Sequence, residues 1–297
     1  MKQQIRIAMA VLLCLAVGVS ALPETPQASG PKAQIRTRPT TTAPAPARSP
    51  ALAAPPLPSL AKQLALGVKQ IVLDPGHGGK DSGAISCHGI AEKDLTLAFA
   101  KLLKKQLETR LGCKVLLTRT HDRFLSLEDR ARVANNAKAD LFISVHANAH
   151  LDPALAGFET FSLNFARDQE SARVAALENA SSRKAMSDLK PLLEKLLRTT
   201  KITESAALAS QVQRNTVAKL RAKGDKVRDL GVKQAPFHVL LGAQMPSVLI
   251  EIGFLSNQEE EKRLKTRQYQ QNLVAGITAG VESYLMETKK VAKAGVR

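Results

Sequence analysis

One stretch of sequence decides the fold of this chain: Ile71-Val-Leu-Asp-Pro-Gly-His-Gly-Gly-Lys-Asp-Ser-Gly-Ala84. Its apolar start predicts a buried strand, which Asp74-Pro75-Gly76 ends abruptly. His77 follows at once among glycines, which adopt unusual backbone angles and allow a ligand close to the main chain. Because open α/β sheets bind ligands at the carboxyl ends of their strands, this placement marks His77 as a candidate functional residue.

Strand and helix patterns alternate after this loop. Apolar residues at helical spacing predict a helix from Glu92 to Gly112, and Ser126 and Asn257 are placed to cap two more. We expect strands at 114–119, 141–145, 157–163, 237–241 and 247–252, and helical structure at 168–221 and from 257 towards 289. This pattern predicts a single α/β domain: a twisted, mostly parallel sheet of about six strands, helices on both faces and an inserted helical segment.

The first residues predict export. Lys2 and Arg6 precede an apolar run, 8–17, that is too short to span a bilayer, and Val19-Ser20-Ala21 resembles a cleavage site. We therefore expect a signal peptide at 1–21, a periplasmic or secreted mature chain and no stable membrane anchor. A retained anchor is the alternative.

Composition divides the rest of the chain. Residues 22–66 are rich in Pro, Ala and Thr and predict a disordered linker, because such a segment buries too little apolar surface to offset its ordering entropy. Residues 67–289 are long enough for one catalytic domain with a full core, and 290–297 form a basic tail.

The formal net charge is +17, from 43 Lys and Arg against 26 Asp and Glu. Such a charge favours a polyanionic surrounding such as the cell wall, although a generally basic exported protein explains it equally well. Aromatic residues make up only 3% and Trp is absent, so we expect no nucleic-acid partner. Cys87 and Cys113 are the cysteines left after cleavage, and whether they pair stays open.

Four groups that carry chemistry follow predicted strands or the loops that leave them: His77, Glu92, His146 and Glu251. Parallel strands place their carboxyl ends on one side of a sheet, so these groups can converge. Two imidazoles and a carboxylate are a familiar zinc set with a fourth position open to water. The remaining carboxylate can then act as a general base.

The sequence resembles the zinc-dependent N-acetylmuramoyl-L-alanine amidases of bacterial cell walls, of the division-associated type. The resemblance rests on four blocks in the family's order: Ile71–Ala84, Glu92, Ser144-Val-His-Ala-Asn148 and Pro246-Ser-Val-Leu-Ile-Glu-Ile-Gly-Phe-Leu-Ser-Asn257. It implies that His77, Glu92 and His146 bind zinc and that Glu251 is catalytic. The implied substrate is peptidoglycan, cut between N-acetylmuramic acid and L-alanine during daughter-cell separation and wall turnover. We expect a monomer.

Two residues depart from the family pattern and are candidates for the substrate cleft. Asn148 stands where the family often has Asp, and an amide would support a ligand imidazole less well than an anion. His238 is an extra histidine, for which a plain strand position is the alternative.

Residues 167–223 are longer than a simple connection requires. They resemble the inserted segment of division-associated amidases, in which a helix blocks the zinc site until an activator protein displaces it. Glu178 is the first candidate for the blocking carboxylate, with Glu194 and Glu204 in reserve, and the leucines of 189–197 are expected to be exposed for the activator. An ordinary covering helix is the alternative.

Two other functions compete with a cell-wall amidase. A zinc peptidase that cuts within the stem peptide would use the same water activation. A non-catalytic wall-binding protein could keep the fold, although the intact set of His77, Glu92, His146 and Glu251 argues against it.

Overall fold

The computed structural model describes residues 68–294, apart from 183–190, 192, 194 and 197–198. The predicted signal peptide and linker lie outside the described residues, and so do Glu194 and three of the leucines of 189–197: Leu189, Leu192 and Leu197. None of the helices described there is long and apolar enough to cross a membrane. Cys87 and Cys113 are both free thiols, so they do not form a disulfide here.

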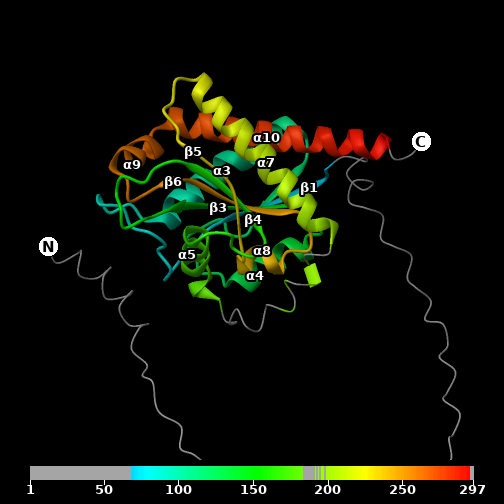
Figure 1. Ribbon diagram of the computed structural model, residues 1–297, viewed down its shortest axis with the longest axis horizontal. Helices are drawn as coiled ribbons and strands as arrows, with labels where there is room; N and C mark the ends of the chain where they lie inside the picture. The colour runs from blue at the N-terminus through cyan, green and yellow to red at the C-terminus, as the bar shows by residue number, and fades with distance from the viewer. Residues whose placement is uncertain (1–67, 183–190, 192, 194, 197–198, 295–297) are drawn as a thin grey trace, which may run out of the picture. The chain divides into compact units, whose positions relative to one another are not determined.

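A six-stranded sheet forms the centre of the domain (Figure 1). Its strands are β1 (Gln70–Pro75), β2 (Lys114–Leu117), β3 (Leu141–Asn148), β4 (Phe158–Leu163), β5 (Asp229–Ala235) and β6 (Ser247–Phe254), in the order β2-β1-β3-β6-β4-β5. All neighbours run parallel except β4 and β6, which are antiparallel. The predicted α/β fold with a mostly parallel sheet is confirmed.

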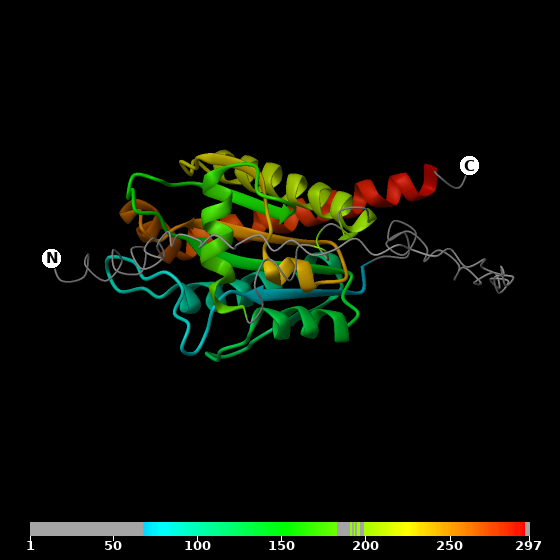
Figure 2. The same ribbon diagram turned by 60° about the horizontal axis from the view of Figure 1, so that its bottom comes forward.

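Helices cover both faces of this sheet (Figures 1 and 2). The first face carries α3 (Glu92–Leu111), α7 (Thr200–Ala222) and α10 (Arg267–Ala294), and the second carries α4 (Leu127–Asn136), α5 (Gln169–Glu178) and α8 (His238–Gly242). The 3₁₀ turn η1 (Asn179–Ser181) follows α5, and α9 (Gln258–Lys265) follows β6.

Alternation along β1 explains why Ile71, Val72 and Leu73 are all apolar. Ile71 and Leu73 belong to the core beneath α3, α7 and α10, whereas Val72 belongs to the core beneath α4, α5 and α8. Successive side chains of a strand point to opposite faces, so a strand covered on both faces carries apolar residues at successive positions. The central strands β1, β3 and β6 are therefore buried, and their carboxyl ends are held in fixed positions.

The predicted helix ends agree with the structure. Ser126 caps α4 by accepting a hydrogen bond from the backbone of Asp129, and Asn257 caps α9 by accepting bonds from Glu259 and Glu260. Gly112 ends α3 in the left-handed conformation, with φ 64°.

Two elements differ from the prediction in the region before β6. Residues 237–241 are not a strand, because His238–Gly242 form the short helix α8, whose Val239, Leu240 and Leu241 are all buried. A short apolar run buried on every side does not distinguish a strand from a helix. The missing strand is β5, Asp229–Ala235, an edge strand whose side chains are mostly half-buried or exposed.

The segment 167–223 divides into parts with different roles. Helix α7 connects the parallel strands β4 and β5, and its Leu208 and Val212 are buried in the first core, so α7 is an ordinary covering helix. Glu204 lies on α7, close to Tyr284 of α10 and apart from the histidines. The expected exposure of the leucines is wrong for Leu193, which packs in the second core, and Leu196 is half-buried against it.

Candidate metal centre

Four predicted side chains converge at the carboxyl ends of β1 and β3. One ligand atom from each of His77, Glu92, His146 and Glu178 lies within 4.8 Å of the others. His77 Nε2 is 3.1 Å from Glu92 Oε2 and 3.3 Å from Glu178 Oε2. His146 Nδ1 is 3.1 Å from Glu92 Oε1 and 2.8 Å from Glu178 Oε2. Both imidazoles and both carboxylates therefore face one point.

The backbone presents His77 in an uncommon conformation. Its φ is +57°, in the left-handed region that few residues other than glycine adopt. Arg119 donates to the carbonyls of Pro75 and Gly76, and Arg130 donates to those of Pro75 and His77, at 2.7–3.0 Å. These two buried guanidinium groups hold the loop in place around His77.

A buried carboxylate supports this arrangement from below. Asp74 forms an ion pair with Arg130 at 2.8 Å and accepts hydrogen bonds from Thr118 Oγ1 and Ser144 Oγ. Burial opposes its charge, but the Arg130 guanidinium and the Thr118 hydroxyl hold the pKa of Asp74 below its usual range. Removing one partner of such a pair would leave a buried charge uncompensated.

Glu92 is oriented by backbone groups as well as by the histidines. Its Oε2 accepts from the Ala84 amide at 2.9 Å, and its Oε1 accepts from the Ala147 amide at 3.0 Å. Burial would raise the pKa of Glu92, but the imidazoles of His77 and His146 lower it below its ordinary value. Glu92 is therefore a fixed carboxylate at the first turn of α3.

Glu251 lies beside this cluster in the sheet. It pairs in register with His146 of β3 on one side and with Glu159 of β4 on the other. It is fully buried, and neither carboxylate oxygen has a hydrogen-bond partner in the described structure. Burial, together with the charges of Glu178 and Glu92, raises the pKa of Glu251 well above its ordinary value. A nearby cation would act in the opposite direction and favour the carboxylate.

The hydrogen-bond pattern fits a divalent cation at the point of convergence. Although carboxylate oxygens lie close, His77 Nε2 and His146 Nδ1 are buried and make no hydrogen bond. Burial would lower the pKa of His146, but Glu178 and Glu92 raise it to about 10, so the surroundings strongly favour a positive charge. Buried nitrogens without hydrogen bonds are rare in native proteins, and two imidazoles with a carboxylate are ligands that zinc prefers.

Glu178 reaches the cluster from the last residue of α5. A carboxylate is disfavoured at a helix C-terminus, and the imidazoles of His77 and His146 compensate for this by close contact. The next residue fixes the end of the helix, because Asn179 Nδ2 donates to the Pro236 carbonyl at 2.9 Å and Asn179 Oδ1 accepts from the His238 amide at 2.8 Å.

The two cleft candidates do not contact the ligand atoms. Asn148 Nδ2 donates to Glu159 Oε1 at 2.8 Å, so its amide serves the carboxylate that flanks Glu251 rather than an imidazole. His238 is buried in α8 and meets the α5 end through its backbone, while its ring nitrogens make no hydrogen bond.

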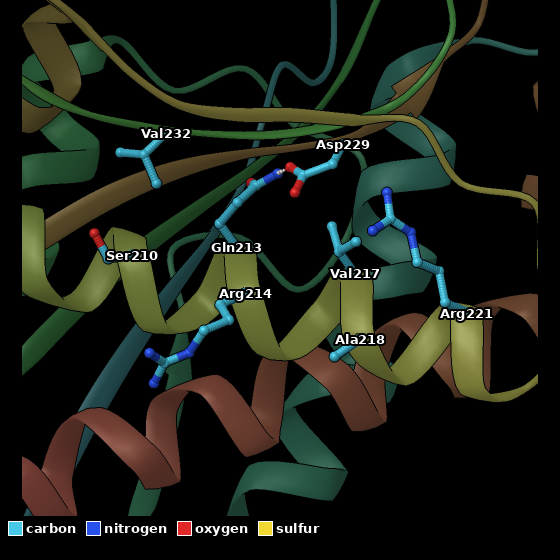
Figure 3. Close-up of a pocket in the computed structure, with 8 residues that line it drawn as sticks. All are labelled: Ser210, Gln213, Arg214, Val217, Ala218, Arg221, Asp229 and Val232. Carbon is cyan, nitrogen blue, oxygen red and sulfur yellow. Dashed lines mark hydrogen bonds between the residues drawn. The ribbon is translucent and has the colours of Figure 1, made fainter.

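A cleft of about 480 Å³ opens beside the cluster, bordered by His77, Lys80, Asp81, Phe124, Leu177, Glu178, Ala180 and Ser181. Another hollow, of about 350 Å³, lies between α7 and β5 (Figure 3). Its acidic residue, Asp229, is hydrogen-bonded to Gln213 at 2.6 Å, and its lining contains neither histidine nor cysteine. The cleft beside His77 is therefore the candidate substrate site.

Comparison with known proteins identifies the family. Residues 71–283 match the N-acetylmuramoyl-L-alanine amidase family. The chain belongs to this family. The predicted family and enzyme class are thereby confirmed.

Individual relatives agree with this assignment. The N-acetylmuramoyl-L-alanine amidase AmiC of Escherichia coli O6:H1 is 34% identical over 233 residues, which are 76% of this chain and 55% of AmiC. The amidase AmiA of Escherichia coli K12 is 36% identical over 228 residues, 73% of this chain and 76% of AmiA. The chain thus spans about half the length of AmiC and three quarters of AmiA.

Solved amidase structures share the fold. The N-acetylmuramoyl-L-alanine amidase from Clostridium difficile 630 superposes with a TM-score of 0.57 at 33% identity, over 74% of this chain and 97% of that one. The CwlD amidase from Clostridioides difficile, solved in complex with the GerS lipoprotein, gives a TM-score of 0.55 at 28% identity, over 74% of this chain and 99% of CwlD.

Sequence reasoning missed two acidic residues of this amidase. Asp81 Oδ1 lies 3.0 Å from His77 Nδ1, where it orients the imidazole, and its signal was an acid four residues after His77 in the same glycine-rich loop. Glu159 forms an ion pair with Lys233 at 2.6 Å beside Glu251. Glu159 lies within an ordinary strand pattern, and nothing in that pattern indicates a buried carboxylate next to Glu251.

Proposed function

We propose that the chain hydrolyses the amide bond between N-acetylmuramic acid and L-alanine in peptidoglycan, with zinc held by His77, Glu92 and His146. The observation that carries this proposal is the pair of buried imidazole nitrogens that face one point without hydrogen bonds. Membership of the N-acetylmuramoyl-L-alanine amidase family supports the assignment of this bond as the one that is cut.

Glu251 is the residue that transfers protons in the proposed reaction. Zinc, when bound, lowers the pKa of a coordinated water to about 7 and polarises a carbonyl group. Glu251 takes the proton of the attacking water and passes it to the departing amine, which leaves poorly unless it is protonated. Asp81 holds the His77 imidazole by its other ring nitrogen, and Glu92 is held by two backbone amides.

Replacing a histidine tests the metal assignment. His77→Ala or His146→Ala should remove one equivalent of bound zinc together with activity, because each variant takes away a nitrogen ligand. His121→Ala, in an exposed loop, is the control and should keep both. Wild-type zinc content in the His77 and His146 variants would refute the assignment.

Product analysis tests the bond. Digestion of purified peptidoglycan should release intact stem peptides and leave glycan without peptide, as expected of an amidase. Shortened peptides would indicate a peptidase that cuts within the stem instead. Binding without any product would indicate a wall-binding protein.

We further propose that Glu178 blocks the zinc position until α5 is displaced. Glu178 Oε2 lies within 3.3 Å of both ligand nitrogens, where a water or a substrate carbonyl would otherwise reach the metal. An occlusion of this kind worth about 1–3 kcal/mol would lower basal activity about 5- to 150-fold. An activator protein that captures α5 would relieve it, and the exposed Leu177 beside Glu178 is a contact for such a partner. The GerS-bound CwlD structure is a precedent for an amidase–protein complex.

Glu178→Ala should therefore raise activity on purified peptidoglycan without a partner present. Glu170→Ala on the same helix is the control, because Glu170 pairs with Arg173 away from the two ligand histidines. If Glu178→Ala keeps its zinc and is no more active than the parent, α5 is only a cover.

The cellular role follows from the proposed chemistry. We expect export by residues 1–21, action in the periplasm or outside the cell and a part in daughter-cell separation. Deleting the gene should leave daughter cells joined, and a chain with Glu251→Gln should fail to separate them. Normal separation after deletion would refute this role.

A further inference from the structure

A second cluster of metal-ligating side chains lies outside the amidase site. Cys87 Sγ is 3.3 Å from Glu261 Oε2 and 3.3 Å from His88 Nδ1, and His88 Nδ1 is 2.7 Å from Glu261 Oε2. These three atoms lie within 4.8 Å of one another, and none of the three residues belongs to the His77 cluster. A thiol, an imidazole and a carboxylate thus meet at one point.

The loop that carries Cys87 and His88 is firmly built. Ile85 and Ala91 form a bridge at its base, and Ser86 bonds Ile90 twice, once through its amide and once through its hydroxyl. Cys87 and His88 occupy the tip and are exposed to solvent. The tip is therefore presented as a unit.

Glu261 supplies the other half of the cluster from a rigid position. It is fully buried on α9, and its Oε1 accepts from Lys265 Nζ at 3.1 Å, which leaves Oε2 for the loop. Along the chain, Glu261 is 174 residues from Cys87 and 173 residues from His88. Only the fold brings them together, so no sequence motif announces the cluster.

We propose that Cys87, His88 and Glu261 form a second metal site, which takes a divalent ion of the zinc type. Thiolate, imidazole and carboxylate are all zinc ligands, and three protein ligands leave a fourth position for water on the solvent side. Binding replaces the thiol proton of Cys87 and any proton on the His88 nitrogen, which are released to solvent. The two negative ligands then balance the charge of the ion.

The ion would fasten the loop to α9. The base of that loop also holds Glu92, because the Ala84 amide donates to Glu92 Oε2 and the Glu92 amide donates to the Ala84 carbonyl. The second site is therefore a clamp beside the amidase centre, and it shares no ligand with that centre.

Cobalt titration of the full chain tests the proposal. A thiolate bound to Co²⁺ gives a charge-transfer absorption in the near ultraviolet, which the His77, Glu92 and His146 set cannot give. The wild type should bind one equivalent with this absorption. Cys87→Ser and His88→Ala should each lose the absorption and one equivalent of bound cobalt. Cys87→Ser keeps the other two thiols of the chain, Cys14 and Cys113, so its loss of absorption would assign the bound thiolate to Cys87.

Two further variants separate this site from the amidase centre. His77→Ala should keep the thiolate absorption, and Cys113→Ala, which changes a buried core thiol, should keep it too. Zinc should raise the melting temperature of His77→Ala but not that of a chain with both His77→Ala and Cys87→Ser. Absence of the thiolate absorption in the wild type, or its survival in Cys87→Ser, would overturn the proposal.

Discussion

Two glycines leave room for the functional groups of the centre. A Cβ at Gly76 would lie 2.4 Å from His146 Cε1, and one at Gly83 would lie 2.5 Å from Glu92 Oε2. Gly83 also has φ +63°, which favours glycine for a second reason. Glycine is thus required at these positions because imidazole and carboxylate pack directly on the main chain.

Gly76→Ala should displace the His146 ring and remove the zinc held by it. The imidazole is buried and cannot swing aside, so we expect a loss of about 1–3 kcal/mol in the free energy of unfolding as well. Gly224→Ala is the control, since it adds a methyl group in open space at φ +81°. It should lower stability but keep full zinc content. Denaturant unfolding and metal analysis measure both effects, and normal zinc content in Gly76→Ala would contradict the packing argument.

The convergence of His77, Glu92 and His146 was predictable because their local patterns are strong. His77 and His146 each follow an apolar run that reads as a buried strand, and Glu92 begins a clear helical stripe. Asp81 was not predicted, because an acid in a polar loop has no periodicity, and its place four residues after His77 gains meaning only with the 3.0 Å distance between the two side chains. The lack of hydrogen-bond partners at the Glu251 carboxylate likewise depends on neighbours from two other strands, β3 and β4.

At the scale of elements, α5 and η1 border the cleft beside His77. Their position depends on Asn179, which joins them to Pro236 and His238 ahead of and within α8. Strand β5 escaped prediction because an edge strand with Gly231, Lys233 and Gln234 lacks the apolar run of a central strand. Helix α8 was not predicted because four of its five residues, His238 to Leu241, are buried, so the segment has no exposed polar face and no amphipathic signal.

Asn179→Ala should raise basal amidase activity several-fold, because it frees the end of α5 without touching Glu178, within the range of about 5- to 150-fold expected for displacement. Asn135→Ala is a matched control: Asn135 Nδ2 donates to the Gly242 carbonyl and its Oδ1 accepts from the Gln244 amide, the same pair of bonds at the other end of α8. Both variants should lose similar stability. Equal basal activities in the two would show that Asn179 does not position Glu178.

At the scale of the whole molecule, the described domain begins just before β1. Asp140 accepts hydrogen bonds from the amides of Lys69 at 2.7 Å and Gln70 at 2.8 Å, and these bonds anchor the start of the fold. The sheet begins at residue 70, and the two hydrophobic cores are built from residues after it. The composition of 22–66 predicts a tether that adds no contact to this core.

A chain that begins at Ala65 should therefore fold, keep its zinc and melt within a few degrees of the full chain. Thermal unfolding of both forms, followed by circular dichroism and with metal analysis before heating, measures this. A clear drop in melting temperature on truncation would show that the preceding segment docks on the domain.

The most direct test of the proposed zinc-dependent reaction is the turnover of Glu251→Gln on purified peptidoglycan, measured together with its zinc content. Glutamine keeps the shape of the side chain but cannot accept the proton of the attacking water. We predict zinc content equal to that of the wild type and release of stem peptides slower by about 10² or more. Release at the wild-type rate by a zinc-loaded Glu251→Gln variant would contradict the assignment of Glu251 as the base.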